Sequence, residues 1–143
     1  AHGFDSAFYV HLSEDIISEE NLAADGIITN AQDLSLWNFR LHSGKILSKK
    51  MYKLMTTSSA KSQHDVFGKE KQGYGYNIRN IVENKINYIG HTGLGDGFSA
   101  LSIYFPKNKV SVVILENVMN KNSDLFYYFE IGIKNMIFLV YWC

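Results

Sequence analysis

The sequence has a single cysteine, Cys143, at its last position. One cysteine excludes an internal disulfide, a CxxC zinc site and a cysteine cluster. A reactive thiol needs surroundings that lower its pKa, and nothing in the sequence points to them, so we interpret Cys143 as incidental.

A strong charge of either sign is also missing. Lysine plus arginine number 14 and aspartate plus glutamate number 14, which gives a formal net charge of zero. A neutral chain lacks the large electrostatic footprint of a nucleic-acid or anionic-membrane binder, so we expect neither partner. The same neutrality removes the repulsion that keeps copies apart, which favours self-association.

Long hydrophobic runs are absent too. The apolar ending MIFLVYWC has eight residues, whereas a membrane-spanning helix needs roughly 20, so we expect no transmembrane segment. The beginning, AHGFDSAFYVHLSEDI, has no basic region followed by an apolar one and is not a signal peptide. It also lacks an initiator methionine. We therefore expect that the chain starts inside a longer protein or after processing.

Motifs for metals and phosphates are missing as well. None of the five histidines pairs with another at i,i+4 or belongs to an HExxH motif, so we expect no metal. The glycines of GLGDG do not fit G-x-G-x-x-G, because position 98 is Phe. They also precede a strand-like run, whereas a phosphate loop precedes a helix. We expect no cofactor.

What the chain does have is enough apolar surface for a core. It has 143 residues, of which 46% are hydrophobic, with nine Phe and nine Tyr. This composition is typical of one folded domain. Within the single unit 1–143, we expect loop and helices over 1–72, antiparallel strands over 73–117 and a C-terminal helix over 118–143. This order predicts an α+β fold, an antiparallel sheet with flanking helices.

The strongest helical pattern is TNAQDLSLWNFRLHSG. Thr29 and Gln32 fit a capping box, and Gly44 is the expected stop. The expected apolar stripe contains Leu34, Trp37 and Leu41.

Two further helices are expected. The segment SKKMYKLMTT predicts a short helix with Ser48 as N-cap and an apolar face of Met51, Leu54 and Met55. The segment NSDLFYYFEIGIKNMIFL predicts a closing helix that begins at Asn122 or Ser123.

Four segments read as strands: GYGYNIRNIV, KINYIGH, GFSALSIYF and KVSVVILEN. The turn PKNK makes the last two an antiparallel hairpin. Their faces are very apolar and need cover, which one closing helix supplies only in part. We therefore expect self-association or low solubility through the exposed sheet.

The stretch YIGHTGLGDGFSALSIYF holds one histidine, one threonine and three glycines within seven residues. It is either a tight hairpin that happens to contain a histidine or the wall of an active site. One small-enzyme interpretation pairs His91 with Ser99 or Asp96 across the turn. Another uses the motif Ser58-Ser59-Ala60-Lys61, in which a helical turn would bring the lysine to the serine. About one such motif is expected by chance, and this one lies in a polar, loop-like stretch.

Several segments together resemble the serine β-lactamase and penicillin-binding protein family, in its class C and D-alanyl-D-alanine carboxypeptidase branch. They are ADGIITNAQDLSLWNFRLHSGKILSKKMYKLMTT, GYGYNI and GHTGLGDGFSALSIYFPKNKVSVVILEN. The resemblance covers about residues 1–117. It implies a partial β-lactamase/transpeptidase-like fold and a serine hydrolase that forms an acyl-enzyme with β-lactams, D-Ala-D-Ala peptides or esters. Family members are commonly extracytoplasmic in bacteria.

The resemblance also implies roles for four residues. The third family motif, Lys/His-Thr/Ser-Gly, corresponds to His91, Thr92 and Gly93. His91 would add a donor or a partial positive charge, and Thr92 would hydrogen-bond the substrate. Gly93 would allow close approach of the substrate, and the N–H of Leu94 would be an oxyanion-hole donor.

Two family motifs are not in the expected places. Neither Tyr-x-Asn nor Ser-x-Asn occurs, and the only Ser-x-x-Lys lies 33 residues before His91. We therefore expect the C-terminal portion of such an enzyme, inactive alone, whose small-molecule or peptide substrate binds the full-length protein. The alternative is a non-catalytic binding or assembly module that retains the sheet.

Overall fold

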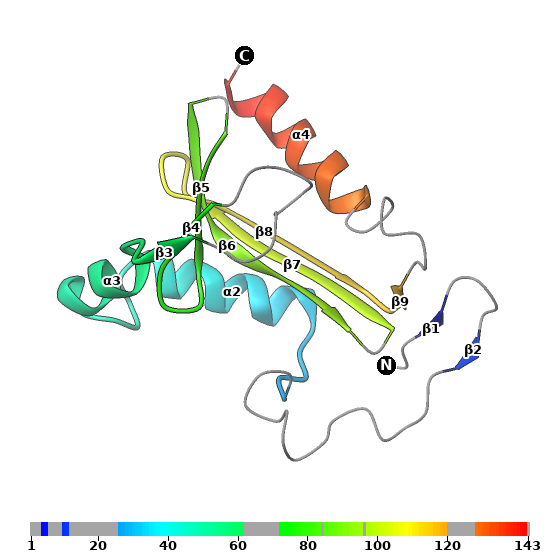
Figure 1. Cartoon of the computed structure of the whole chain (residues 1–143). Helices are drawn as coiled ribbons and strands as arrows, with labels where there is room; N and C mark the ends of the chain where they lie inside the picture. The colour runs from blue at the N-terminus through cyan, green and yellow to red at the C-terminus, as the bar shows by residue number, and fades with distance from the viewer. Residues whose placement is uncertain are drawn as a thin grey trace.

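The centre of the molecule is an antiparallel meander in which each strand pairs with its neighbour in the sequence. The computed structural model describes residues 4–5, 10–11, 26–61, 72–83, 85–95, 97–119 and 128–142. Within them the main sheet has six strands in the order β3-β4-β5-β6-β7-β8 (Figure 1). Their bounds are β3 Ala60–Lys61, β4 Gly73–Tyr74, β5 Arg79–Glu83, β6 Ile86–Gly95, β7 Phe98–Phe105 and β8 Val110–Glu116. With the helices α2 (Ala31–His42), α3 (Lys49–Thr56) and α4 (Tyr128–Trp142) around it, this sheet confirms the α+β prediction.

A smaller sheet joins the beginning of the chain to a short strand that follows β8. The strand β1 (Phe4–Asp5) pairs antiparallel with β2 (Val10–His11) and parallel with β9 (Val118–Met119). The beginning of the chain therefore lies beside the segment that follows β8 (Figure 1).

The helix α2 (Ala31–His42) begins one residue later than the sequence suggested. Its N-cap is Asn30, not Thr29. The Asp33 N–H donates to Asn30 Oδ1 and Asn30 Nδ2 donates to Asp33 Oδ2, both at 2.8 Å. Asn30 and Asp33 therefore form the reciprocal cap that we assigned to Thr29 and Gln32. The expected stop is confirmed, because Gly44 has φ +77° just past the helix end.

The face of α2 that packs on the sheet is centred on a polar residue. The Asn38 side chain is buried, and its Nδ2 donates to the Ile103 carbonyl at 3.1 Å and to Ser111 Oγ at 2.8 Å. Trp37 is 54% exposed, so placing it in the buried stripe was wrong. An amide that satisfies a sheet carbonyl can occupy this interface at little cost, whereas an unpaired polar group could not.

The short helix α3 (Lys49–Thr56) confirms Ser48 as its N-cap. Its packed face is shifted from the predicted one: Tyr52 and Met55 contact a buried cluster on the sheet, while Met51 and Leu54 are about half exposed. The cluster consists of Ile78, Ile89 and Tyr104.

The first predicted strand, GYGYNIRNIV, is two strands. A turn separates β4 from β5, with Asn77 at φ 52° and the Gly75 N–H donating to the Ile78 carbonyl at 2.8 Å. Asn tolerates the left-handed conformation, and the apolar alternation continues through the turn, which hid it.

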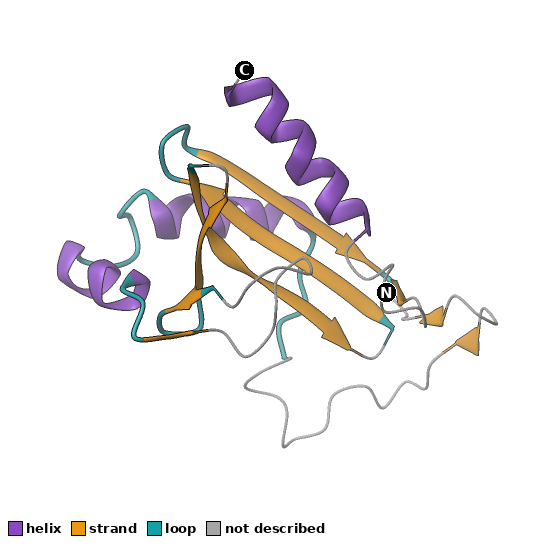
Figure 2. Ribbon diagram, turned by 45° about the horizontal axis from the view of Figure 1, so that its top comes forward, coloured by secondary structure: helices purple, strands orange, loops and turns teal. Residues whose placement is uncertain are grey.

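Helices lie on both faces of the sheet (Figure 2). The helix α4 (Tyr128–Trp142) places Ile137 and Phe138 on the larger core cluster, and α2 and α3 lie on the other side. That cluster contains Ile81, Ile86, Tyr88, Leu101, Ile103 and Phe105. The sheet is thus better covered than the sequence suggested. The predicted N-caps of the closing helix, Asn122 and Ser123, lie outside the described residues.

A buried ion pair fixes α4 to β5. The Lys134 ammonium is 1% exposed and lies 2.7 Å from Glu83 Oε2. The Tyr88 hydroxyl donates to the same carboxylate oxygen at 3.0 Å. Burial, together with the Glu83 charge, raises the pKa of Tyr88, so the phenol stays protonated and remains a donor.

Candidate active-site wall

The four residues that the resemblance singles out lie in the second half of β6. His91, Thr92, Gly93 and Leu94 pair with Ser102, Leu101, Ala100 and Ser99 of β7. The hairpin turns between Gly95 and Phe98, and Gly97 has φ +79°. His91 and Thr92 are half-buried, and Gly93 and Leu94 are exposed.

Within the described residues, this half of β6 has an open edge. The strand β5 pairs with β6 only from Ile86 to Gly90, where Gly90 is opposite Arg79. Among the described strands, residues 91–95 pair with β7 alone. Backbone groups on the side away from β7 can therefore pair with an extended ligand.

Both ring nitrogens of His91 have contacts. Nδ1 lies 2.6 Å from the Thr92 carbonyl oxygen, and Nε2 lies 2.9 Å from the Tyr74 hydroxyl. Because a carbonyl oxygen only accepts, a neutral ring bonded this way carries its proton on Nδ1 and accepts at Nε2. The Tyr74 hydroxyl also lies 2.9 Å from Asn77 Oδ1, so its single proton can go to either acceptor.

The charge on His91 follows from its surroundings. Burial lowers its pKa first, the nearby Arg79 charge lowers it further, and the Thr92 carbonyl opposes both. A lowered pKa leaves the imidazole neutral at neutral pH. The structure therefore favours a hydrogen-bonding role for His91 over the partial positive charge.

Thr92 is oriented by a buried cation. Arg79 is 6% exposed, and its Nη1 donates to Thr92 Oγ1. An oxygen that accepts from Arg79 keeps its own proton to donate elsewhere. The guanidinium also supplies positive charge beside this hydroxyl, and that charge favours an anionic group on a ligand.

Two glycines of this strand, Gly90 and Gly93, differ in how much space surrounds them. A Cβ at Gly90 would lie 2.1 Å from the Ser102 carbonyl oxygen, so the close approach of β6 and β7 requires glycine there. A Cβ at Gly93 would meet only Ala100 Cβ at 3.7 Å, an ordinary contact. Packing within the described residues does not require glycine at 93, and ligand approach remains the predicted reason for it.

The motif from Ser58 to Lys61 and the pairing of His91 with Ser99 are both wrong in their geometry. Ser58 precedes the extended β3, so Lys61 is not one helical turn away, and Ser58 Oγ accepts from Asn80 at 3.1 Å. Ser99 is opposite Leu94, on the other face of the sheet from His91, because side chains alternate along a strand. Its hydroxyl donates to Glu116 Oε2 at 2.7 Å. Asp96 lies outside the described residues.

Sequence reasoning missed Tyr74 and Arg79. Tyr74 lies in a segment that carries the family resemblance, yet nothing marked it as a partner of His91. Arg79 had one available signal: it is one of two arginines in the chain and stands in an apolar strand.

In the part of the chain that the structure describes, no group of three or more His, Cys, Asp or Glu could hold a metal ion. The described helices include none long and apolar enough to cross a membrane.

Comparisons with known proteins place this wall in a family. The chain is similar to the octameric penicillin-binding protein homologue from Pyrococcus abyssi, with a TM-score of 0.56 and 23% identity over 74% of this chain. This chain spans 24% of the length of the Pyrococcus abyssi protein. At this identity, the similarity between the two structures shows the fold alone. No curated protein matches. The Beta-lactamase family model matches residues 2–130. The chain therefore belongs to the beta-lactamase family, the serine β-lactamase and penicillin-binding protein group that its sequence resembles.

Proposed function

We propose that this chain forms one wall of an acyl-transfer site in a longer serine hydrolase. The substrates would be β-lactams, D-Ala-D-Ala peptides or esters. The observation that carries the proposal is the open edge of β6 at residues 91–95, beside a threonine held by a buried arginine. Family membership supports the reaction class.

The edge suits a substrate with an extended amide backbone and a carboxylate. Backbone groups of β6 would pair with the amide groups, as in strand addition. The Thr92 hydroxyl would donate to the carboxylate, and Arg79 would orient that hydroxyl and supply positive charge. The Leu94 N–H would donate to the oxygen that becomes negative when the carbonyl is attacked.

The covalent steps need a serine that this wall does not supply. A base takes the serine proton as the serine oxygen attacks the substrate carbonyl. The carbonyl–nitrogen or carbonyl–oxygen bond then breaks, and the base gives that proton to the leaving group. Water then hydrolyses the acyl-enzyme. The sequence contains no Tyr-x-Asn or Ser-x-Asn motif. Its only Ser-x-x-Lys, which would supply the serine and the lysine that activates it, is not where the family has that motif. An oxyanion donor without a nucleophile leaves only weak residual catalysis, so the chain alone should be inactive.

His91 would act by positioning. Its Nε2 contact with Tyr74 and its Nδ1 contact with the Thr92 carbonyl connect β4 to the wall. A neutral imidazole there would hold the β6 backbone in place beside the ligand without adding charge.

Intact-protein mass after incubation with a reactive β-lactam tests this proposal. The chain described here and the full product of its gene are compared, and a Thr92→Val variant of the longer product is included. We expect one adduct on the longer product, slower acylation of the variant, and no adduct on the short chain. An adduct on a serine of the short chain would overturn the proposal. So would a longer product that contains upstream Ser-x-x-Lys and Tyr-x-Asn motifs and yet never reacts.

A second candidate is a non-catalytic binding or assembly module. The observation in its favour is that the only Ser-x-x-Lys of the sequence ends in the strand β3 and not in a helix. Self-association belongs to both candidates: the similar protein from Pyrococcus abyssi is octameric, which supports assembly of this chain as well. A gene whose true start lies near Ala1 would favour the module over the hydrolase.

A further inference from the structure

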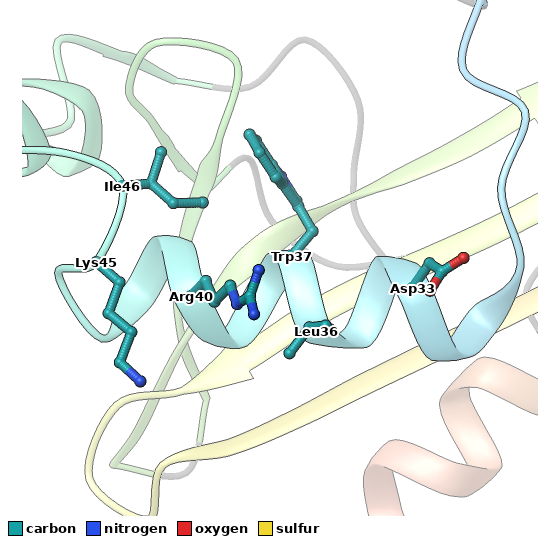
Figure 3. Close-up of a pocket in the computed structure, with 6 residues that line it drawn as sticks. All are labelled: Asp33, Leu36, Trp37, Arg40, Lys45 and Ile46. Atoms are coloured by element: carbon teal, nitrogen blue, oxygen red, sulfur yellow. The ribbon is translucent and has the colours of Figure 1, made fainter.

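The outer face of α2 carries an open groove. Asp33, Leu36, Trp37 and Arg40 recur at i, i+3, i+4 and i+7, so they lie on one side of the helix. Lys45 and Ile46, from the segment after α2, complete the lining (Figure 3). This side is opposite to the one where Asn38 contacts the sheet.

The middle of the groove is apolar and its ends are charged. Leu36 and Trp37 are about half exposed, although α2 needs neither of them to bind the sheet. Asp33 lies in the first turn of the helix, and Arg40 lies in the last turn with Lys45 beyond it. A tryptophan with charged residues around it is typical of the centre of a protein interface.

The order of these residues fits a two-fold axis. The point midway between Leu36 and Trp37 is also midway between Asp33 and Arg40. A two-fold rotation about this point lays a second α2 antiparallel to the first. Each Asp33 then meets the partner's Arg40, with Lys45 nearby, and each Leu36 meets the partner's Trp37. Every contact forms twice, as an isologous interface requires.

We propose that a second copy of this chain binds here, through antiparallel pairing of the two α2 helices. The pairing also opposes the two helix dipoles, and the zero net charge of the chain adds no repulsion. The inference rests on the proposed self-association and is independent of the hydrolase chemistry.

A second exposed apolar face lies on α4, with Met136, Leu139 and Val140. Lys134 of the same helix is buried against Glu83, so it offers no charge on that face. Charges fix register and exclude wrong partners, and the α2 face has them in complementary order. The contact is short, because a 12-residue helix is about 18 Å long. We therefore expect a weak dimer, at the small end of specific interfaces.

Charge reversal tests the geometry. Asp33→Arg and Arg40→Asp are made separately, and sedimentation equilibrium measures dimerisation of the wild type, each variant and an equimolar mixture. Each reversal places like charges opposite each other twice, so each should weaken the homodimer at least about tenfold. In the mixture, every introduced charge meets an opposite one, and a heterodimer about as tight as the wild-type dimer should form. Damage to the fold could not be repaired in this way.

Matched variants locate the surface. Leu36→Asp should abolish the dimer, whereas Leu139→Asp on α4 and Lys107→Asp in the exposed β7–β8 turn should keep it. A wild-type chain that stays monomeric overturns both this surface and self-association. A dimer that ignores both charge reversals, or depends on Leu139 and not on Leu36, overturns the surface alone. These outcomes leave the β-lactam adduct experiment untouched, so the two proposals fail separately.

Discussion

The two halves of β6 have opposite surroundings. Residues 86–90 lie between β5 and β7, beneath α4, and Tyr88 is 1% exposed. Residues 91–95 pair with β7 alone among the described strands, and Leu94 is 40% exposed. One continuous strand thus has a part held on every side and a part left open. The first half supplies stability, and the second half can therefore keep an edge that no described strand covers.

The largest expected effect is loss of the aromatic contact beneath α4. Phe105 is fully buried, with its ring 5.4 Å from Tyr88 and 6.0 Å from Phe138. Phe105→Ala should lower the free energy of unfolding by about 3–5 kcal/mol, because it leaves a cavity. Urea denaturation measures this, with Leu94→Ala in the open half as the control, which should cost less than about 1 kcal/mol. Equal losses in the two variants would refute the division of β6.

The next effect concerns the buried ion pair between Lys134 of α4 and Glu83 of β5, which lies opposite the start of β6. Lys134→Met leaves the Glu83 carboxylate without its cation and should cost about 3 kcal/mol in thermal or urea unfolding. The double variant Lys134→Met with Glu83→Gln removes the charge and should regain much of the loss. If the double variant is no more stable than the single one, the cost does not come from an uncompensated carboxylate.

A smaller effect is a dependence of stability on pH through His42. Its ring stacks on Tyr104 at 4.6 Å, and Tyr104 is opposite Ile89 in the covered half of β6. Burial lowers the pKa of His42 from 6.5 to about 4. The unfolded chain therefore takes up a proton at this histidine before the folded chain does. The contribution of the neutral His42 ring to the free energy of unfolding is therefore complete above pH 6.5 and is lost as the pH falls to about 4.

Because His42 is only partly buried, we expect the free energy of unfolding to fall by about 2 kcal/mol between pH 6.5 and about pH 4. Urea denaturation at several pH values measures it, and His42→Leu should flatten the curve by that amount. Other groups, His91 included, contribute in both proteins, so the difference between the two curves is the readout. Parallel curves would show that His42 titrates normally.

The smallest effect on stability is expected at Gly93, in the open half of the strand. Gly93→Ala should change the free energy of unfolding by less than about 0.5 kcal/mol, because its Cβ meets only an ordinary contact. Gly90→Ala is the matched variant and should cost about 2 kcal/mol or more, because its Cβ collides with the Ser102 carbonyl. In the full gene product, Gly93→Ala should slow acylation by a β-lactam despite its normal stability. Unchanged acylation would remove the predicted role of Gly93.

Local features of the fold were predictable from the sequence. Ser48 as N-cap, Gly44 as helix stop and the hairpin at PKNK each depend on a few neighbouring residues. The buried face of α2 was not predictable from its apolar period, because distant acceptors on Ile103 and Ser111 select Asn38 over Trp37. The turn at Asn77 was missed because one polar residue in an alternating strand looks like an exposed position.

The candidate site shows the same limit. Family resemblance found the motif from His91 to Leu94, and its roles stay predictions. Tyr74 and Arg79 reach His91 and Thr92 from other strands, 17 and 13 residues away in the sequence. Such contacts depend on the register between strands, which a single sequence does not reveal.

The strands of the main sheet follow one another in space as they do in the chain. During synthesis, each new strand can pair with the one made just before it, without waiting for a distant segment. The face that holds Tyr88 and Phe105 nevertheless needs α4, which is translated after the whole sheet. Until α4 has been translated, none of the described elements covers this apolar face. This stage is where a molecular chaperone would have the most to protect.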